Sequence, residues 1–211
     1  MKLPVRLLAA VAAACALPHP GAAAAKGSDL GQGLSYIRVH ELPADLPSPP
    51  SGRPGPCVLD LRFAKSNEAD ALALRAWART NASPRAPIFV LENAATSPSL
   101  LASLPGNGPR GLIVLAPASA GLGPDIAVRV AADLDRRAYE ALEKGAPVQS
   151  LLSDNPEKPR VDEAYLEKEH LSDGDAPDAA TGKPSPPSPL VDAMLQRAVQ
   201  LHRGLLALKK A

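Results

Sequence analysis

The sequence predicts an α/β domain, a sheet covered by helices on both faces. Short uninterrupted apolar runs such as 87–91 (PIFVL) and 111–116 (GLIVLA) are typical of strands buried on both sides. Segments with apolar residues at spacings of three and four, as amphipathic helices have, separate several of these runs. The order is strand, strand, helix, strand, helix, strand, strand, helix, which favours parallel strands joined through crossover helices.

Each strand is expected to be short. The alternation in LSYIRV predicts a strand with one buried face at 34–39, and the Pro-, Ser- and Gly-rich stretch 42–56 predicts a loop. Further strands are expected at 57–61, 87–91, 111–116 and, with a weaker pattern, 125–130.

Three helices are expected within the domain. Asn67 is expected to cap a helix over 68–80, whose apolar stripe contains Leu74 and Trp77. A short helix is expected at 96–104. The last runs over 133–143 and ends before Gly145, a residue that often terminates helices.

The amino terminus has the features of a cleavable export signal over residues 1–25. Lys2 and Arg6 precede an apolar run over 7–17, and a Pro/Gly break with small residues follows, so cleavage is expected near Ala24 or Ala25. The run is too short to span a bilayer. We therefore expect a periplasmic or secreted protein; lipidation at Cys15 is the alternative, and it would tether the protein to a membrane.

Composition narrows the classes of function. Signal removal leaves 21 basic against 22 acidic residues, a balance that favours no nucleic-acid partner. Cys57 is then the one remaining cysteine, so no internal disulfide is expected, and its apolar neighbours predict an inert buried thiol. No metal-ligand spacing, phosphate loop or cofactor motif occurs in the sequence, so neither a metal nor a cofactor is expected.

Two segments follow the domain at 34–152. Residues 153–189 contain 13 charged residues and seven prolines, a composition that predicts a disordered linker. Residues 190–208 predict an amphipathic helix with an apolar stripe that includes Leu195 and Leu205, and His202 at its edge. We expect the stripe to dock on the domain as core; the alternative is that it binds a partner helix or a membrane surface.

Three segments together resemble the catalytic domain of the C-terminal processing (tail-specific) serine peptidases. They are CVLDLR at 57–62, PIFVLENAATSPSLLASL at 87–104 and GLIVLAPASAGLGPDIAVRV at 111–130. The resemblance covers about 34–152 and implies a crotonase/ClpP-like β-β-α spiral. It implies a nucleophilic hydroxyl in the turn after Asn93, where Thr96, Ser97 and Ser99 stand.

The chemistry that the resemblance implies is incomplete in this sequence. A hydroxyl needs a base to become a nucleophile, and the family's base is a Lys beyond the turn. No Lys or His occurs between Lys65 and Lys144. The Gly-rich loop of the family is replaced by 63–67 (FAKSN), whose backbone has less freedom to form an oxyanion site. Lys65 is the candidate displaced base, and helix capping is the structural alternative for the three hydroxyls.

The remaining candidate residues have structural explanations as well. Asp60 lies in a buried strand, and an ion pair with Arg62 is expected to satisfy it. Together with Asn93, these two residues are weak candidates for a binding site. We therefore expect an exported, catalytically inactive peptidase-like domain that binds a peptide or protein. The alternatives are an active serine endopeptidase with a displaced base, and a structural or assembly subunit that forms homo-oligomers.

Overall fold

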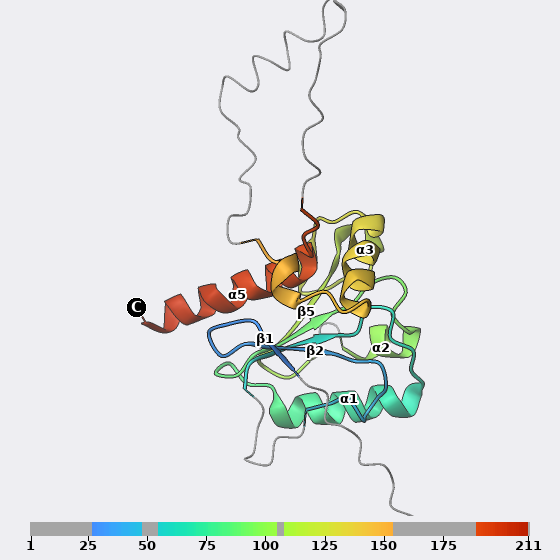
Figure 1. The fold of residues 1–211 in the computed structure, drawn as a ribbon. Helices are drawn as coiled ribbons and strands as arrows, with labels where there is room; N and C mark the ends of the chain where they lie inside the picture. Colours follow the sequence, from blue (N-terminus) through green and yellow to red (C-terminus); the bar gives the residue numbers. More distant parts are fainter. Residues whose placement is uncertain (1–26, 48–54, 105–107, 154–188, 211) are drawn as a thin grey trace, which may run out of the picture.

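The computed structural model describes residues 27–47, 55–104, 108–153 and 189–210. The predicted signal and all but the end residues of the predicted linker lie outside these ranges. The described chain forms a six-stranded sheet with helices on both faces, which confirms the predicted α/β class (Figure 1).

The strands lie in the sheet in the order in which they occur along the chain, β1 to β6. β1 runs antiparallel to β2, and every other neighbouring pair is parallel. Their bounds are Ser28–Asp29 (β1), Ser35–Arg38 (β2), Cys57–Asp60 (β3), Ile88–Leu91 (β4), Leu112–Pro117 (β5) and Ile126–Val128 (β6). The expected strands are present with ends that differ by at most about two residues from the predicted ones, and β1 was not predicted. Because β2 to β5 are in near-level register, their carboxyl ends meet at one edge of the sheet.

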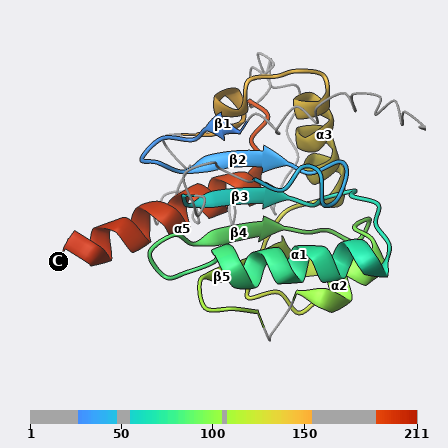
Figure 2. The same ribbon diagram turned by 90° about the horizontal axis from the view of Figure 1, so that it is seen from below.

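The helices divide between the two faces according to the connections they make. α1 (Glu68–Asn81) and α2 (Pro98–Ser103) connect β3 to β4 and β4 to β5, and they lie on the same face (Figures 1 and 2). Crossovers of one hand in a sheet of sequential order place their helices on one side. The other face is covered by elements that follow β6, namely α3 (Ala132–Glu143), the 3₁₀ turn η2 (Val148–Leu151) and α5 (Ala193–Lys210). A further 3₁₀ turn, η1 (Ala118–Ala120), follows β5.

Alternating strand residues enter two separate cores. Leu59 and Val90 belong to the core under α1 and α2, whereas Val58, Phe89 and Leu91 belong to the core under α5. Residues of β3 and β4 are buried on both faces, which explains their continuous apolar runs.

The amino terminus of α1 forms as the sequence predicts. The Asn67 side chain accepts a hydrogen bond from the Asp70 backbone N–H, and the Asp70 carboxylate accepts one from the Asn67 N–H. This reciprocal capping box satisfies two backbone donors that the helix itself leaves unpaired. The helix ends at Asn81, one residue beyond the predicted end.

α5 completes the second core. Met194, Leu195 and Ala198 are fully buried against a face that includes Phe89. Asp192 precedes the helix and its Oδ1 accepts a hydrogen bond from the Leu195 backbone N–H at 3.0 Å. His202 is buried edge-on to Phe89 and its Nε2 lies 3.2 Å from the Gln32 carbonyl oxygen. The first half of the helix is therefore an integral part of the fold.

One glycine permits a close approach of two backbone segments before β5. Gly111 has φ +95°, and a Cβ atom there would lie 2.3 Å from the Ser83 carbonyl carbon. We expect Gly111→Ala to lower the free energy of unfolding by about 3 kcal/mol or more, because backbone strain and a backbone clash act together. Urea denaturation at neutral pH measures this loss.

Gly145 provides a matched control for that substitution. It has φ +88°, but a Cβ atom there would meet nothing within 4 Å. Gly145→Ala should therefore lower the free energy of unfolding by about 1–2 kcal/mol, the strain of a left-handed backbone conformation at a residue with a side chain. Equal losses in the two variants would show that the approach of Gly111 to Ser83 is not tight.

Candidate functional site

The candidate site lies where β3, β4 and β5 end together at one edge of the sheet. Ligands of α/β proteins commonly bind outside the carboxyl ends of parallel strands. Three features meet at this edge: a buried ion network around Arg62, a turn rich in hydroxyl groups after Asn93, and a small cavity.

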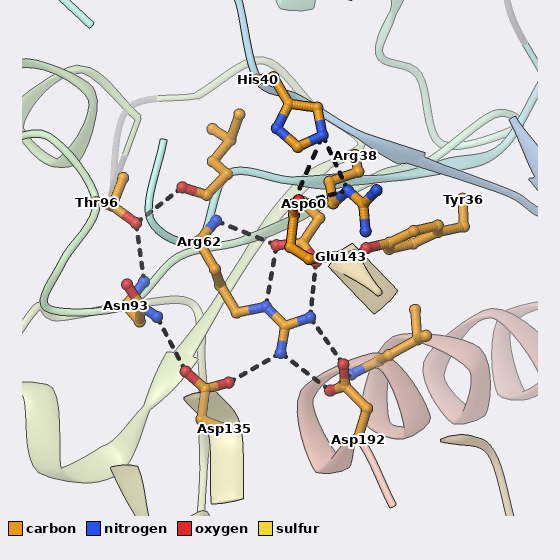
Figure 3. Close-up of polar contacts among 12 residues, drawn as sticks. Tyr36, Arg38, His40, Asp60, Arg62, Asn93, Thr96, Asp135, Glu143 and Asp192 are labelled. Atoms are coloured by element: carbon orange, nitrogen blue, oxygen red, sulfur yellow. Dashed lines mark hydrogen bonds and ion pairs between the residues drawn. The ribbon is translucent and has the colours of Figure 1, made fainter. Parts of the chain in front are cut away.

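Arg62 is the centre of the ion network and is fully buried (Figure 3). Its Nε and Nη2 donate to the two carboxylate oxygens of Asp60 at 2.9 and 2.7 Å. The ion pair expected from the sequence is therefore present. A two-pronged pair of this kind fixes the guanidinium plane relative to the end of β3.

Two further carboxylates, which the sequence did not lead us to expect, complete the coordination of Arg62. Nη1 donates to Asp135 of α3 at 2.9 Å, and Nη2 donates to Asp192 before α5 at 2.7 Å. A strand and two helices far apart in sequence are thus joined through one side chain (Figure 3). Burial alone would lower the pKa of Arg62, but Asp192 and Asp60 raise it well above its ordinary value.

Neutral donors add hydrogen bonds to two of these carboxylates. The Tyr36 hydroxyl donates to Asp60 Oδ2 at 2.7 Å, and the Asn93 amide donates to Asp135 Oδ2 at 2.9 Å. Burial, with the nearby Asp60, raises the pKa of Tyr36 far above its ordinary value, so the hydroxyl remains a donor. The network nevertheless contains three buried carboxylates and one guanidinium, so removal of the cation should be costly.

The hydroxyl-rich turn is bound to the loop that follows β3. Thr96 Oγ1 donates to the Leu61 carbonyl oxygen at 3.0 Å and accepts from the Asn93 N–H. Ser97 Oγ donates to the Ser66 carbonyl oxygen at 3.0 Å and accepts from the Ser66 N–H at 3.1 Å. Each hydroxyl therefore serves as a bridge between the two loops.

Ser99 lies in the same cluster. Its Oγ is 3.0 Å from the Ser66 Oγ and 3.3 Å from the Ser66 carbonyl oxygen. Ser97 occupies the N-cap position of α2, as the helix-capping alternative predicts. Its side chain, however, makes no capping hydrogen bond, so that part of the prediction is wrong. The reason is that Ser66 offers it both a donor and an acceptor from the neighbouring loop.

Lys65 directly precedes Ser66 in the loop after β3, which is far from the hydroxyl-rich turn in sequence. The two loops are neighbours, as the displaced-base alternative requires, because Ser66 bonds to both Ser97 and Ser99. The Lys65 side chain, however, is exposed, and no hydrogen bond links it to either serine in the described chain. The arrangement provides no base in contact with these hydroxyls among the described residues.

Phe63 takes the place expected for a flexible glycine. Its φ is +63°, in the left-handed region that side chains other than glycine's rarely adopt. Its ring packs on Tyr139 with centroids 4.8 Å apart, and the Arg136 guanidinium lies 5.6 Å from its centroid. The loop thus adopts a glycine-like turn, held by aromatic and cation–π contacts instead of glycine's freedom.

A cavity of about 240 Å³ opens beside Phe63. Its lining is mostly small and apolar and includes four polar or charged side chains. The lining residues are Phe63, Asn93, Ala94, Ala95, Pro117, Ser119, Ala120, Ala132, Asp135 and Arg136. Small-molecule sites usually measure roughly 300–1,000 Å³. This volume suits one apolar side chain of a larger partner better than a complete small ligand.

Glu92, which directly precedes Asn93, is an unexpected buried acid. The side chain is 0% exposed, and neither carboxylate oxygen has a hydrogen-bond partner among the described residues. Burial, with a further contribution from the negative charge of Asp125, raises the pKa of Glu92 to about 7. Its alternation with Leu91 and Val90 places it on the α1/α2 side of the sheet, away from the Arg62 network.

A second polar cluster lies at the end of β2. Arg38 Nε is 3.0 Å from His40 Nε2 and 3.2 Å from Glu143 Oε1 of α3 (Figure 3). These side chains are partly exposed and lie outside the turn that contains Ser97. The cluster joins α3 to the sheet edge.

The other chemical expectations concern single residues. Cys57 is fully buried, and burial raises the pKa of its thiol to about 12, in agreement with an inert thiol. Asp125 Oδ2 accepts a hydrogen bond from the Val114 N–H at 2.8 Å. Within the described ranges, no cluster of three or more His, Cys, Asp or Glu side chains could hold a metal ion. No helix in the same part of the chain is long and apolar enough to cross a bilayer.

Comparison of the chain with protein-family models, with curated proteins and with solved structures found no match.

Proposed function

We propose that this chain is an exported binding domain, built on a crotonase/ClpP-like β-β-α spiral, that recognises an apolar side chain of a peptide or protein without cleaving it. The proposal rests on one observation above all. The hydroxyls of Thr96, Ser97 and Ser99, where the resemblance places a nucleophile, are hydrogen-bonded to the loop after β3. Among the described residues, none of the three is hydrogen-bonded to a Lys or His side chain that could act as a base.

The cavity supports the binding half of the proposal. Its walls combine the face of Phe63 with several small side chains, which leave room for a branched or aromatic side chain from a partner. Burying such a side chain contributes about 1.5–3 kcal/mol. Arg136, stacked on Phe63, adds a donor that can meet a peptide carbonyl or carboxylate at the entrance.

The rigid surroundings of the cavity favour binding as well. Asn93 and Asp135 line it, and both belong to the buried network around Arg62. Side chains fixed in this way lose little conformational entropy when a ligand arrives. The export signal that the sequence predicts would place such a domain outside the cytoplasm, together with other exported proteins.

Filling the cavity should abolish this binding. We expect Ala120→Phe to weaken the affinity of the chain from Lys26 onward for short fluorescent peptides with a central Leu or Phe by about 10- to 100-fold, the equivalent of burying one such side chain. Fluorescence anisotropy gives the affinities, with a peptide carrying a central Ala as the weak reference.

Ala118→Phe is the matched control. Ala118 lies in the same 3₁₀ turn, η1, but is exposed and does not line the cavity. Its substitution should leave the affinity within about twofold of that of the unmodified protein, which is a change of about 0.4 kcal/mol or less in the binding free energy. Equal affinities for all three peptides, or equal losses in both variants, would reject the cavity as the binding site.

A further inference from the structure

A basic edge lies at the amino ends of the strands, opposite the candidate site. It consists of Arg85 in the turn between α1 and β4, Arg110 before β5, and Lys209 near the end of α5, all exposed. Figure 2 shows α5 running past the amino ends of β2, β3 and β4, so that its carboxyl-terminal end projects from the sheet.

Direct contacts hold these three segments together. Lys209 Nζ donates to the Arg85 carbonyl oxygen at 3.4 Å. Ser83, two residues before Arg85, packs so closely on Gly111 that no side chain fits between them. Since Arg110 adjoins Gly111, three cationic side chains from distant parts of the sequence are anchored in one region.

The positive charge of this edge is not balanced locally. The segments that form it, 76–87, 108–112 and 193–210, contain no acidic residue. Arg85, Arg110 and Lys209 form no ion pair in the described chain. The acidic residues of α1, Glu68 and Asp70, lie in its first turn, at the opposite end of the helix.

An exposed apolar side chain accompanies the charges. Leu208 is 76% exposed, and the adjacent Leu205 and Leu206 are only partly buried. Basic residues beside an apolar side chain at a projecting helix end are typical of segments that insert into the headgroup region of anionic bilayers.

We propose that the basic edge, Arg85, Arg110 and Lys209 together with Leu208, docks the protein on an anionic lipid bilayer. The cations attract the headgroups, and Leu208 enters the boundary between headgroups and acyl chains. A nucleic acid would also attract the cations, but its phosphate backbone offers no apolar region into which Leu208 could insert. The inference is independent of the peptide cavity, which lies at the other edge of the sheet.

Vesicle sedimentation tests this surface with the chain from Lys26 onward, which lacks the apolar signal. We expect binding to phosphatidylcholine vesicles that contain phosphatidylglycerol, release at high salt, and no binding to phosphatidylcholine alone. Each cation should contribute about fivefold in affinity, so Arg85→Glu/Arg110→Glu/Lys209→Glu should weaken binding by about a hundredfold or more. Leu208→Ser should weaken binding several-fold at any salt concentration.

A control that reverses exposed cations elsewhere, compared per charge, separates the effect of this edge from the effect of net charge. Arg129→Glu/Arg137→Glu reverses two exposed cations elsewhere, at the end of β6 and in α3, and should leave binding within a few-fold. Circular dichroism melting curves confirm that every variant is folded. Absence of binding to the anionic vesicles, binding to DNA but not to vesicles, or an equal loss per charge in the control would overturn the proposal.

Discussion

Replacement of Arg62 by Met is expected to destabilise the fold by about 5 kcal/mol, the upper end of the effect of breaking a buried ion pair. The guanidinium is fully buried and meets Asp60, Asp135 and Asp192, whose charges would remain without a cation. Because whole domains are stable by only about 5–15 kcal/mol, the variant should be mostly unfolded at modest urea concentrations. Urea denaturation followed by circular dichroism measures the loss.

Two milder variants keep this prediction testable if Arg62→Met does not fold. Arg62→Lys retains the charge, but its single nitrogen cannot reproduce the fork of hydrogen bonds that the guanidinium makes, so it should be destabilising but less so than Arg62→Met. Asp192→Asn removes one charge and leaves Arg62 paired with Asp60 and Asp135, so it should cost least. A loss below about 1 kcal/mol in Arg62→Met would contradict the central place of this residue.

Replacement of Glu92 by Gln is expected to alter the pH dependence of stability by about 3 kcal/mol. The pKa of Glu92 is raised to about 7 by burial and by Asp125, and in the part of the chain that the structure describes both of its oxygens lack hydrogen-bond partners. The folded state therefore holds a proton that the unfolded state releases near pH 4.5. Stability from this group is present below pH 4.5 and is lost as pH rises to about 7.

The comparison of the two proteins isolates this single group. Urea denaturation from pH 4 to 8 should show that Glu92→Gln gains about 3 kcal/mol relative to the unmodified protein as pH rises, and that the gain levels off above pH 7. The neutral amide carries the same burial cost at every pH, so only the change with pH matters. Parallel stability curves for the two proteins would show that Glu92 is not held protonated.

Asp125→Asn tests the smaller cause of the raised pKa of Glu92, the negative charge of Asp125. Its amide oxygen can still accept the hydrogen bond from the Val114 N–H, but its charge is gone. The pH dependence should become smaller without disappearing, because burial is the larger cause of the raised pKa.

The α/β class and most elements could be predicted from local patterns. The runs that became β3 and β4 are apolar throughout because both of their faces are covered. Asn67 capped α1 as expected, since an N-cap depends on residues only three positions apart. β1 escaped prediction because two residues are too few to show an alternation.

The candidate site was only partly predictable because it depends on contacts between distant segments. The pair of Asp60 and Arg62 could be inferred from spacing, whereas Asp135 and Asp192 join it from 73 and 130 residues away. A buried Arg with several donors gives a general reason to seek further carboxylates. It does not say which helix supplies them.

The hydroxyl turn shows the same limit. The sequence indicated Thr96, Ser97 and Ser99 as a group, but their common partner is the loop at 61–66, which lies about 30 residues earlier. The burial of Glu92 could not be predicted, because a Glu followed by Asn and Ala resembles the start of an exposed turn. Its burial follows from the way the end of β4 is covered in the folded chain.

Labelling by a fluorophosphonate serine probe decides whether any of these hydroxyls is an active nucleophile. A serine hydroxyl without a base is unreactive, since general-base assistance is typically worth about 10²- to 10⁴-fold in rate. We expect the purified chain from Lys26 onward to remain unlabelled and to leave unstructured peptides with apolar carboxyl termini intact, while still binding them. Labelling that disappears in Ser97→Ala or Ser99→Ala, together with peptide cleavage that Lys65→Ala abolishes, would contradict the account and identify Lys65 as the base.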